Sequence, residues 1–271
     1  MRPAGTSLAT VIGVETTIDS EDLALRAHLA RPPGTDSGGR LRGLVLCHGF
    51  PADPRGAATA GESYPELADR LAADAGWAVL TFSFRGTNGS PGDFSLGGWL
   101  TDLRRATEHL LDAADVDGVW LAGFSAGGAL ALCAAGEDER VRGVASFAAP
   151  AEFGRWADDP ENFLEHARSV GAVHTSGFPE SFADWARELA EIRPVALVAK
   201  VPPRPVLLVH GSDDDTVSVM DARALAEATD GQAELRIITG AGHRLRHDPR
   251  AVAVLLGWLE SQRSIVTDKE S

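Results

Sequence analysis

Ser125 stands in a segment whose residue types could make a serine hydroxyl reactive. It is the centre of a G-x-S-x-G pattern at 123–127, between an apolar run that starts at 118 and stops at Gly123 and a helical pattern of small residues at 126–135. A strand followed at once by a helix requires a sharp turn at Ser125, and the two flanking glycines remove the Cβ atoms that would clash there. Such a turn presents the serine at its tip, so we predict that Ser125 is a nucleophile.

Two later loops carry the base and the carboxylate that a serine nucleophile needs. The loop at 210–217 holds three successive aspartates, and the segment at 240–243 ends in His243. Each follows a predicted strand, and parallel strands present their carboxyl ends at one edge of a sheet, where the serine turn also lies. We therefore expect both loops to reach Ser125. His247 is the alternative base, but its place before the last helix favours a surface or capping contact.

The elements that must position these groups alternate between strand and helix. Apolar or alternating runs predict about eight strands, and segments with helical periodicity separate most of them. The first two strands form an antiparallel hairpin with a turn at 19–22, and the rest predict an α/β fold with a mostly parallel sheet and helices on both faces. The strands are expected at 10–18, 23–31, 43–47, 77–82, 118–123, 141–148, 205–210 and 233–239, and the helices at 63–75, 98–114, 126–135, 219–228 and 249–261.

The alternation is interrupted between residues 151 and 200. This stretch has broken amphipathic segments, no strand pattern and six large aromatic residues. We expect a helical lid at 151–200, inserted into a single domain that spans 1–271, because the insertion leaves the sheet at the edge that carries Ser125. Its aromatic side chains would form either a small core of the insertion or part of a substrate pocket. They are Phe153, Trp156, Phe163, Phe178, Phe182 and Trp185.

Composition excludes several other classes of protein. A formal net charge of -14 over 271 residues opposes binding to nucleic-acid phosphates. No run approaches the roughly 20 apolar residues of a membrane span. Residues 1–10 lack the apolar core of a secretory signal, so we expect a cytoplasmic protein that binds no membrane. Cys47 and Cys133 lie in apolar patterns and are expected to be buried, reduced thiols. The sequence is compatible with a homodimer.

No cofactor and no metal site are expected. A dinucleotide-binding motif that starts at Gly123 needs glycine where Ser125 stands, and a phosphate-binding loop needs lysine where Ala129 stands. No histidine, cysteine or acidic residues have the spacing of metal ligands. His48 and His210 end predicted strands, and we interpret both as structural histidines bonded to nearby backbone.

Four motifs give the chain, over roughly residues 20–262, a resemblance to the α/β-hydrolase superfamily. Within it the chain is similar to small carboxylesterases, and feruloyl-esterase-like and dienelactone-hydrolase-like enzymes are the nearest groups. The resemblance implies an α/β-hydrolase fold with a helical lid. The motifs are His48-Gly49-Phe50, Phe84-Arg85-Gly86 with Gly89-Ser90, Gly123-Phe124-Ser125-Ala126-Gly127, and His210-Gly211 with Asp214 and Val217.

The resemblance also implies a role for each side chain of a catalytic triad. Ser125 would be the nucleophile and His243 the base that takes its proton. The spacing H-G-x-x-D-x-x-V places the acid at Asp214. Its neighbours Asp213 and Asp215 are the alternative acids, although a solvated turn explains them equally simply.

An oxyanion hole formed by the backbone N–H groups of Phe50 and Ala126 follows from the same resemblance. Ala126 opens a predicted helix, where N–H groups are unpaired and the helix dipole favours negative charge. We therefore expect a serine hydrolase that cleaves a small carboxylic ester with an apolar or aromatic part, through an acyl-enzyme on Ser125. Thioesters, lactones, peptides or acyl transfer would use the same groups. A non-catalytic ligand-binding homologue is the least favoured alternative.

Overall fold

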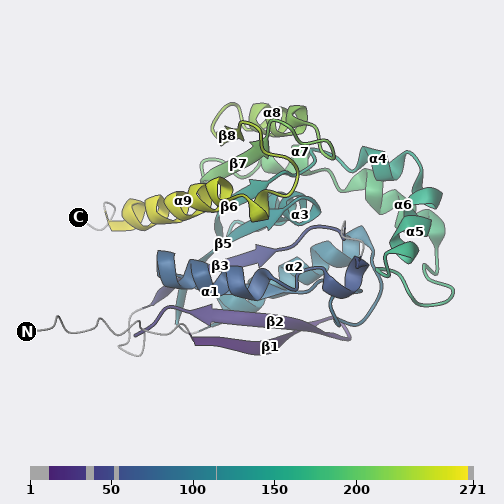
Figure 1. Ribbon diagram of the computed structural model, residues 1–271, viewed down its shortest axis with the longest axis horizontal. Coiled ribbons are helices and arrows are strands. Elements are labelled where there is room, and N and C mark those ends of the chain that lie inside the picture. Colours follow the sequence, from purple (N-terminus) through teal and green to yellow (C-terminus); the bar gives the residue numbers. More distant parts are fainter. Residues whose placement is uncertain (1–11, 35–39, 52–54, 114, 268–271) are drawn as a thin grey trace, which may run out of the picture.

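The structure is a computed structural model that describes residues 12–34, 40–51, 55–113 and 115–267. Within them, an eight-stranded open sheet has the order β1-β2-β4-β3-β5-β6-β7-β8 (Figure 1). β2 pairs antiparallel with both β1 and β4, and every other neighbouring pair is parallel. The predicted α/β architecture is confirmed. The strands are β1 Ile12–Ser20, β2 Leu23–Arg31, β3 Leu41–Cys47, β4 Ala78–Phe82, β5 Val116–Phe124, β6 Val141–Phe147, β7 Val206–Gly211 and β8 Glu234–Ile238.

The turn of the β1–β2 hairpin is tighter than the four-residue turn that the sequence predicts. Ser20 pairs with Leu23, so Glu21 and Asp22 alone connect the strands. Glu21 has a φ of 53°. Positive φ at the first position of a two-residue turn matches the twist of the strands that it joins, which explains the shorter connection. The start of the predicted first strand and the N-terminal segment that precedes it lie outside the described residues.

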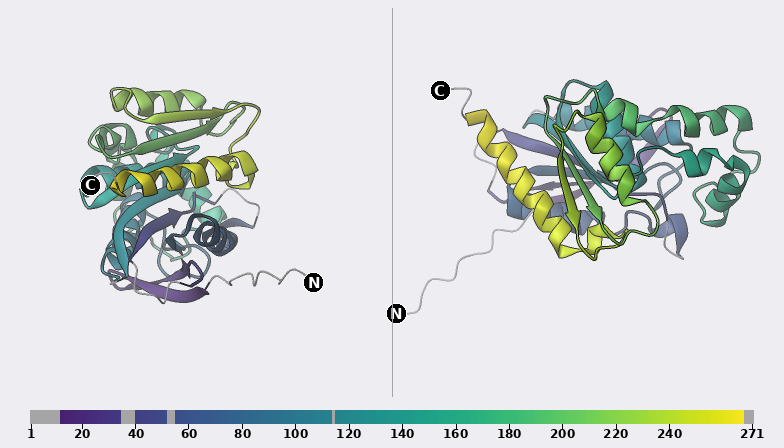
Figure 2. Two further views of the ribbon diagram at one scale, coloured as in Figure 1. Left: turned by 90° about the vertical axis from the view of Figure 1, so that its left-hand side faces the viewer. Right: turned by 90° about the horizontal axis from the view of Figure 1, so that it is seen from above.

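Helices cover both faces of the sheet (Figure 2). α1 and α9 contribute to the hydrophobic core on one face, and α2, α3 and α8 to the core on the other. Of the helices in the described ranges, none combines the length and the apolarity needed to cross a bilayer. The helices are α1 Tyr64–Ala75, α2 Leu96–Leu111, α3 Ala126–Glu137, α8 Val219–Ala228 and α9 Pro249–Thr267, with 3-10 turns η2 Gly56–Thr59 and η3 Leu245–His247.

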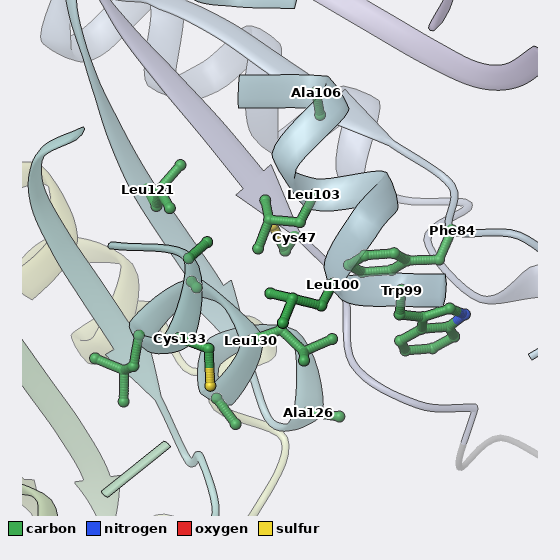
Figure 3. Close-up of a cluster of buried hydrophobic side chains, with 14 of the residues drawn as sticks. Cys47, Phe84, Trp99, Leu100, Leu103, Ala106, Leu121, Ala126, Leu130 and Cys133 are labelled. Atoms are coloured by element: carbon green, nitrogen blue, oxygen red, sulfur yellow. The ribbon is translucent and has the colours of Figure 1, made fainter. Parts of the chain in front are cut away.

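Helix α3 is buried on every side, which accounts for its small and apolar residues. Every residue from Ala126 to Ala135 is buried. The helix packs against β5, β6 and α2. Figure 3 shows part of this cluster, with residues of α3 beside residues of α2 and β5. Cys47 and Cys133 lie in this cluster as free thiols, and burial raises the pKa of both, which confirms the predicted buried thiols. A helix packed on all sides holds its first residue, and hence Ser125 before it, in a fixed place.

The insertion at 151–200 consists of helices and irregular segments, as its sequence predicts. α4, α5 and α6 project beyond the sheet, at the far side of the molecule from the C-terminus (Figures 1 and 2). α7 instead packs against α3 and is part of the main body. The four helices are α4 Gly154–Ala157, α5 Pro160–Ser169, α6 Phe182–Glu191 and α7 Pro194–Val198.

Aromatic rings join the insertion to the main body. Trp156 and Phe163 stack with ring centroids 4.1 Å apart. The ring of Phe163 also lies 5.3 Å from that of Phe50 and 5.7 Å from that of Phe94, both in the main body. Trp185 Nε1 donates a hydrogen bond to the carbonyl oxygen of Phe94 at 3.1 Å. These aromatic residues therefore form a core that the insertion shares with the body, not a core of its own.

Candidate active site

Ser125 lies at the turn between β5 and α3, as predicted. Its φ of 54° and ψ of -127° fall in a region that costs a non-glycine residue about 1–3 kcal/mol. A Cβ on Gly123 would lie 2.4 Å from the carbonyl oxygen of Gly127, and a Cβ on Gly127 would lie 2.1 Å from the carbonyl oxygen of His48. Only glycine fits at these two positions, so the end of β3 can pack directly against the start of α3 beside the serine.

Ser125, His243 and Asp214 form one continuous line of hydrogen bonds. His243 Nε2 is 3.0 Å from Ser125 Oγ, and His243 Nδ1 is 2.9 Å from Asp214 Oδ2. An ionised Asp214 accepts from Nδ1–H, which leaves the lone pair of Nε2 directed at the serine hydroxyl. The side chain of Asp214 is fully buried and that of His243 is 15% exposed. This arrangement can withdraw the proton of the serine as its oxygen attacks.

Asp214 is held as a carboxylate by four hydrogen-bond donors. Its Oδ1 accepts from the N–H groups of Thr216 and Val217, each at 2.9 Å. Its Oδ2 faces His243 and His210. Burial alone would raise the pKa of Asp214, but the hydrogen bonds from His210, His243, Val217 and Thr216 together lower it below its usual range. The carboxylate is therefore ionised at neutral pH, as a partner of His243 must be.

The alternative acids and the alternative base lie outside this line of hydrogen bonds. Asp213 and Asp215 are exposed. Asp213 accepts a hydrogen bond from the neighbouring Ser212 Oγ, and Asp215 from Thr216 Oγ1. His247 is exposed in η3 and contacts the Arg246 side chain. Asp214 alone of the three aspartates faces His243, because its side chain turns inward under the loop.

His210 contacts the site, which the sequence did not indicate. Its side chain is fully buried, and its Nε2 lies 3.0 Å from the carbonyl oxygen of Val217 and 3.2 Å from Asp214 Oδ2. Both partners are acceptors, so Nε2 carries the proton. The backbone contact is the one expected of a structural histidine, whereas the contact with Asp214 depends on the fold of the 210–217 loop. Nδ1 has no hydrogen-bond partner among the described residues.

His48 is buried beside the serine turn and organises the backbone around it. Its Nδ1 lies 2.8 Å from the carbonyl oxygen of Gly49, and its Nε2 lies 3.2 Å from both Phe84 N and Thr87 Oγ1. Burial lowers the pKa of His48 to about 4; the bond to Gly49 opposes this shift, and the charge of Arg246 adds to it. A neutral ring with the proton on Nδ1 donates to the carbonyl oxygen of Gly49 and accepts from the N–H of Phe84, while Thr87 Oγ1 donates to the carbonyl oxygen of Phe84 at 2.6 Å. His48 is a structural histidine, as expected, and it fixes the loop that precedes Phe50.

The backbone around the serine contains the two N–H groups predicted for an oxyanion hole. Ala126 is the first residue of α3, where an N–H has no partner within the helix. The N–H of Phe50 has no acceptor among the described residues. A Cβ on Gly49 would lie 2.9 Å from both Phe124 O and Ser125 Cβ, so the segment before Phe50 passes directly beside the nucleophile. Both N–H groups thus belong to segments that adjoin Ser125, and neither has a backbone acceptor among the described residues.

Two cavities, each of about 590 Å³, meet at Ser125. The histidine-side cavity is lined by His243, Phe50 and Tyr64, among others, and by charged residues of α1, of η3 and of the segments that adjoin η2 and η3. The insertion-side cavity is lined by Ala126, by Val217 and by three aromatic side chains of the insertion. These side chains are Phe153, Trp156 and Phe163. Where side chains are described, no cluster of histidine, cysteine and acidic residues has the geometry of a metal site.

The chain belongs to the alpha/beta hydrolase family, whose sequence model matches residues 44–255. This match spans the serine turn, the acid loop and His243. The fold, with its mostly parallel sheet and the serine at a strand-to-helix turn, agrees with that membership.

A curated relative and several solved structures are similar to the chain. An uncharacterized protein of Mycobacterium tuberculosis, Rv2307c, is 30% identical over 76% of this chain, which spans 64% of that relative's length. Est1E from Butyrivibrio proteoclasticus with bound ferulic acid has a TM-score of 0.63 and 21% identity, covering 92% of this chain and 97% of Est1E. An acetyl xylan esterase from Paenibacillus sp. R4 has a TM-score of 0.71 and 19% identity, covering 95% of this chain and 86% of that enzyme. At these identities, the structural likeness establishes the fold.

Proposed function

We propose that the protein is a serine hydrolase that cleaves carboxylic esters through an acyl-enzyme on Ser125. The observation that carries this proposal is the line of hydrogen bonds from Ser125 Oγ through His243 to a buried Asp214, with distances of 3.0 and 2.9 Å. The strained backbone at Ser125 adds support, because strain of this kind is retained where the surrounding structure serves a reaction. One of the structural relatives is an acetyl xylan esterase, which points the same way.

In the first half of the reaction, Ser125 Oγ attacks the ester carbonyl carbon while His243 Nε2 takes the hydroxyl proton. The carbonyl oxygen becomes an oxyanion, which the N–H groups of Phe50 and Ala126 stabilise. The bond between the carbonyl carbon and the alcohol oxygen then breaks, and His243 gives its proton to the leaving alcohol. Asp214 stabilises the imidazolium that exists between these two proton transfers.

In the second half, water takes the place of the alcohol. His243 removes a proton from the water as its oxygen attacks the acyl carbon, and a second oxyanion forms in the same hole. The bond to Ser125 Oγ breaks, the serine recovers its proton from His243, and the carboxylic acid leaves. Each proton that His243 accepts is returned within the cycle, so the reaction needs no cofactor.

The insertion supplies the apolar contacts of the proposed substrate and acts as its lid. Phe153, Trp156 and Phe163 line the insertion-side cavity next to Ser125. Flat aromatic surfaces of this kind favour a substrate with an apolar or aromatic group. The ferulic acid that occupies Est1E is an aromatic acid, which agrees with this choice. We therefore place an aromatic or apolar acyl group in this cavity.

Ser125→Ala tests the proposed nucleophile. Removal of the oxygen that attacks the ester should lower kcat for 4-nitrophenyl butanoate by roughly 10⁴-fold or more, with the fold intact. A fluorophosphonate should label the native protein at Ser125, as located by peptide mass spectrometry, and should not label the variant. Ser261 on α9 is an exposed serine remote from the site, and Ser261→Ala is the matched control. Near-native turnover by Ser125→Ala, or label on another residue, would contradict the assignment.

A further inference from the structure

The two cavities at Ser125 carry opposite charge, although the protein as a whole is strongly acidic. The histidine-side cavity is lined by three arginines and two glutamates. The insertion-side cavity is lined by three carboxylates and a single arginine. The arginines of the first are Arg55, Arg244 and Arg246, and the carboxylates of the second are Glu152, Asp159 and Asp221. An anionic group of a substrate is therefore attracted to the first cavity and repelled by the second.

Arg244 and Arg246 have guanidinium groups available for a ligand. Neither forms an ion pair with a carboxylate of the described residues, whereas Arg55 pairs with Glu62 at 3.2 Å in the same cavity. Glu66 also lines the cavity, is exposed and forms no such pair among the described residues. Arg246 Nη2 contacts His247 Nε2, and the remaining guanidinium donors of the two arginines have no protein carboxylate among the described residues. A planar guanidinium of this kind matches a carboxylate or phosphate in two parallel hydrogen bonds.

Arg246 is held in place beside the reacting groups. Its guanidinium carbon lies 5.1 Å from the ring centroid of Tyr64, in the geometry of a cation–π contact. The buried Tyr64 ring in turn contacts Phe124, the residue before the nucleophile, with ring centroids 6.0 Å apart. Arg244 directly follows His243 in the chain. Both arginines are thus tied to elements that carry the proposed triad, not to a distant surface.

The position of His243 decides which half of an ester lies beside these arginines. The leaving alcohol must receive its proton from His243 Nε2, so it must lie on the side of the serine that His243 faces. His243 lines the histidine-side cavity and does not line the other one. The leaving alcohol therefore belongs in the histidine-side cavity, and the acyl group belongs in the insertion-side cavity with the aromatic side chains.

We propose that the substrate is an ester whose alcohol half carries an anionic group, a carboxylate or a phosphate, bound by Arg244 and Arg246. The inference rests on the proposed esterase function, and it adds the charge and the orientation of the substrate. It assigns an apolar or aromatic acyl group to the insertion-side cavity and an acidic alcohol to the histidine-side cavity.

Three esters of one chromophore family test the charge and the side. The first is 2-nitrophenyl butanoate, which is neutral. The second, 3-butanoyloxy-4-nitrobenzoate, adds a carboxylate to the same leaving group. The third, 2-nitrophenyl hydrogen adipate, carries its carboxylate on the acyl half. We expect the native enzyme to prefer the second ester and to discriminate against the third, measured as kcat/KM at low ionic strength, where charge interactions are screened least.

Substitution of the arginines should change these preferences selectively. In the Arg244→Gln/Arg246→Gln double variant, kcat/KM for 3-butanoyloxy-4-nitrobenzoate should fall about tenfold more than kcat/KM for the neutral ester. Arg246→Lys keeps the positive charge and should keep most of the preference. Arg246→Glu should reverse it. Arg223, an exposed arginine on α8 outside both cavities, provides the matched control, and Arg223→Gln should leave the ratio of the two rates unchanged.

The outcomes separate this inference from the proposed function. The native enzyme could hydrolyse all three esters while the double variant leaves the ratio of kcat/KM for 3-butanoyloxy-4-nitrobenzoate to kcat/KM for the neutral ester unchanged. That result would overturn the anionic subsite and leave the esterase function standing. A fall in kcat/KM for the adipate ester alone in the double variant would place the arginines on the acyl side and overturn the proposed orientation of the substrate. No hydrolysis of any ester, together with no fluorophosphonate label on Ser125, would overturn both proposals.

Discussion

At the scale of single residues, the unexpected feature of the site is that two histidines share one carboxylate oxygen. His243 Nδ1 and His210 Nε2 lie 2.9 and 3.2 Å from Asp214 Oδ2. His243 would change its protonation during the reaction, whereas His210 is fully buried and directs its Nε2 at the carboxylate. His210 thereby helps to lower the pKa of Asp214 and fixes the direction of its carboxylate. We interpret it as a positioning residue that acts through Asp214.

Substitution of His210 tests that role. His210→Phe keeps a buried planar ring but removes the hydrogen-bond donor. The negative charge of Asp214 should then be less stabilised, and its pKa should rise. We expect kcat to fall by far less than the roughly 10⁴-fold expected of Ser125→Ala, and the acidic limb of the rate profile to move to higher pH. His210→Gln, which restores an N–H donor, should recover part of both changes. A purely structural role predicts lower stability with an unmoved pH profile, and the profile of kcat/KM against pH distinguishes the two.

At the scale of elements, the site depends on how closely β3, β5 and α3 approach one another. A Cβ at position 127 would lie 2.1 Å from the carbonyl oxygen of His48, a distance that backbone atoms cannot accept without moving. The carboxyl end of β3 also begins the segment that carries the N–H of Phe50. The same contact therefore supports both the serine turn and the proposed oxyanion hole.

Gly127→Ala should damage stability and activity together. We expect a loss of about 2–4 kcal/mol in the free energy of unfolding, because the added methyl group must push β3 away from α3. Gly257 on α9 is the matched control. It is exposed, it lies within a helix, and no atom outside its own helix backbone lies within 4 Å of the position that a Cβ would take. Gly257→Ala should stabilise the protein by about 0.5–1 kcal/mol. Urea denaturation measures the free energy of unfolding of the two variants. An equal change in that free energy at the two sites would contradict the packing argument.

At the scale of the whole molecule, neutral His48 links the sheet to the loops around the site. It lies between the end of β3 and the loop after β4, and its ring contacts Phe84 and Trp99 edge-on. Burial lowers its pKa from 6.5 to about 4, so the folded protein keeps it neutral where an unfolded chain would protonate it. Its contribution to stability is therefore complete above pH 6.5 and is lost as the pH falls toward 4.

The stability of the native protein should consequently fall on acidification by an amount that His48 determines. Between pH 7 and pH 5 the unfolded state gains a proton at this position and the folded state does not, which costs about 2 kcal/mol. His48→Asn retains a donor and an acceptor but cannot titrate. Between pH 7 and pH 5 the variant should therefore lose less free energy of unfolding than the native protein, by about that amount. Urea denaturation at the two pH values measures the difference, and parallel losses in both proteins would refute this assignment.

Much of this protein follows from local properties of its sequence. The apolar runs, the helical periodicities and the two glycines around Ser125 determine the strands, the helices and the turn. Chain order and the rule that parallel strands end at one edge were enough to bring His243 and the aspartates of the 210–217 loop toward the serine, and the spacing shared with the α/β-hydrolase superfamily singled out Asp214. These inferences succeed because hydrophobic periodicity and backbone sterics act over a few residues.

Tertiary structure alone decided the features that depend on distant parts of the chain. The contact of His210 with Asp214 requires the folded 210–217 loop, and no pattern in that loop distinguishes it from a backbone contact. The opposite charges of the two cavities arise because η3, α1 and the insertion approach Ser125 from different sides. Which charges face one another depends on packing between elements, and the amino-acid sequence records no distance between residues that are far apart along the chain.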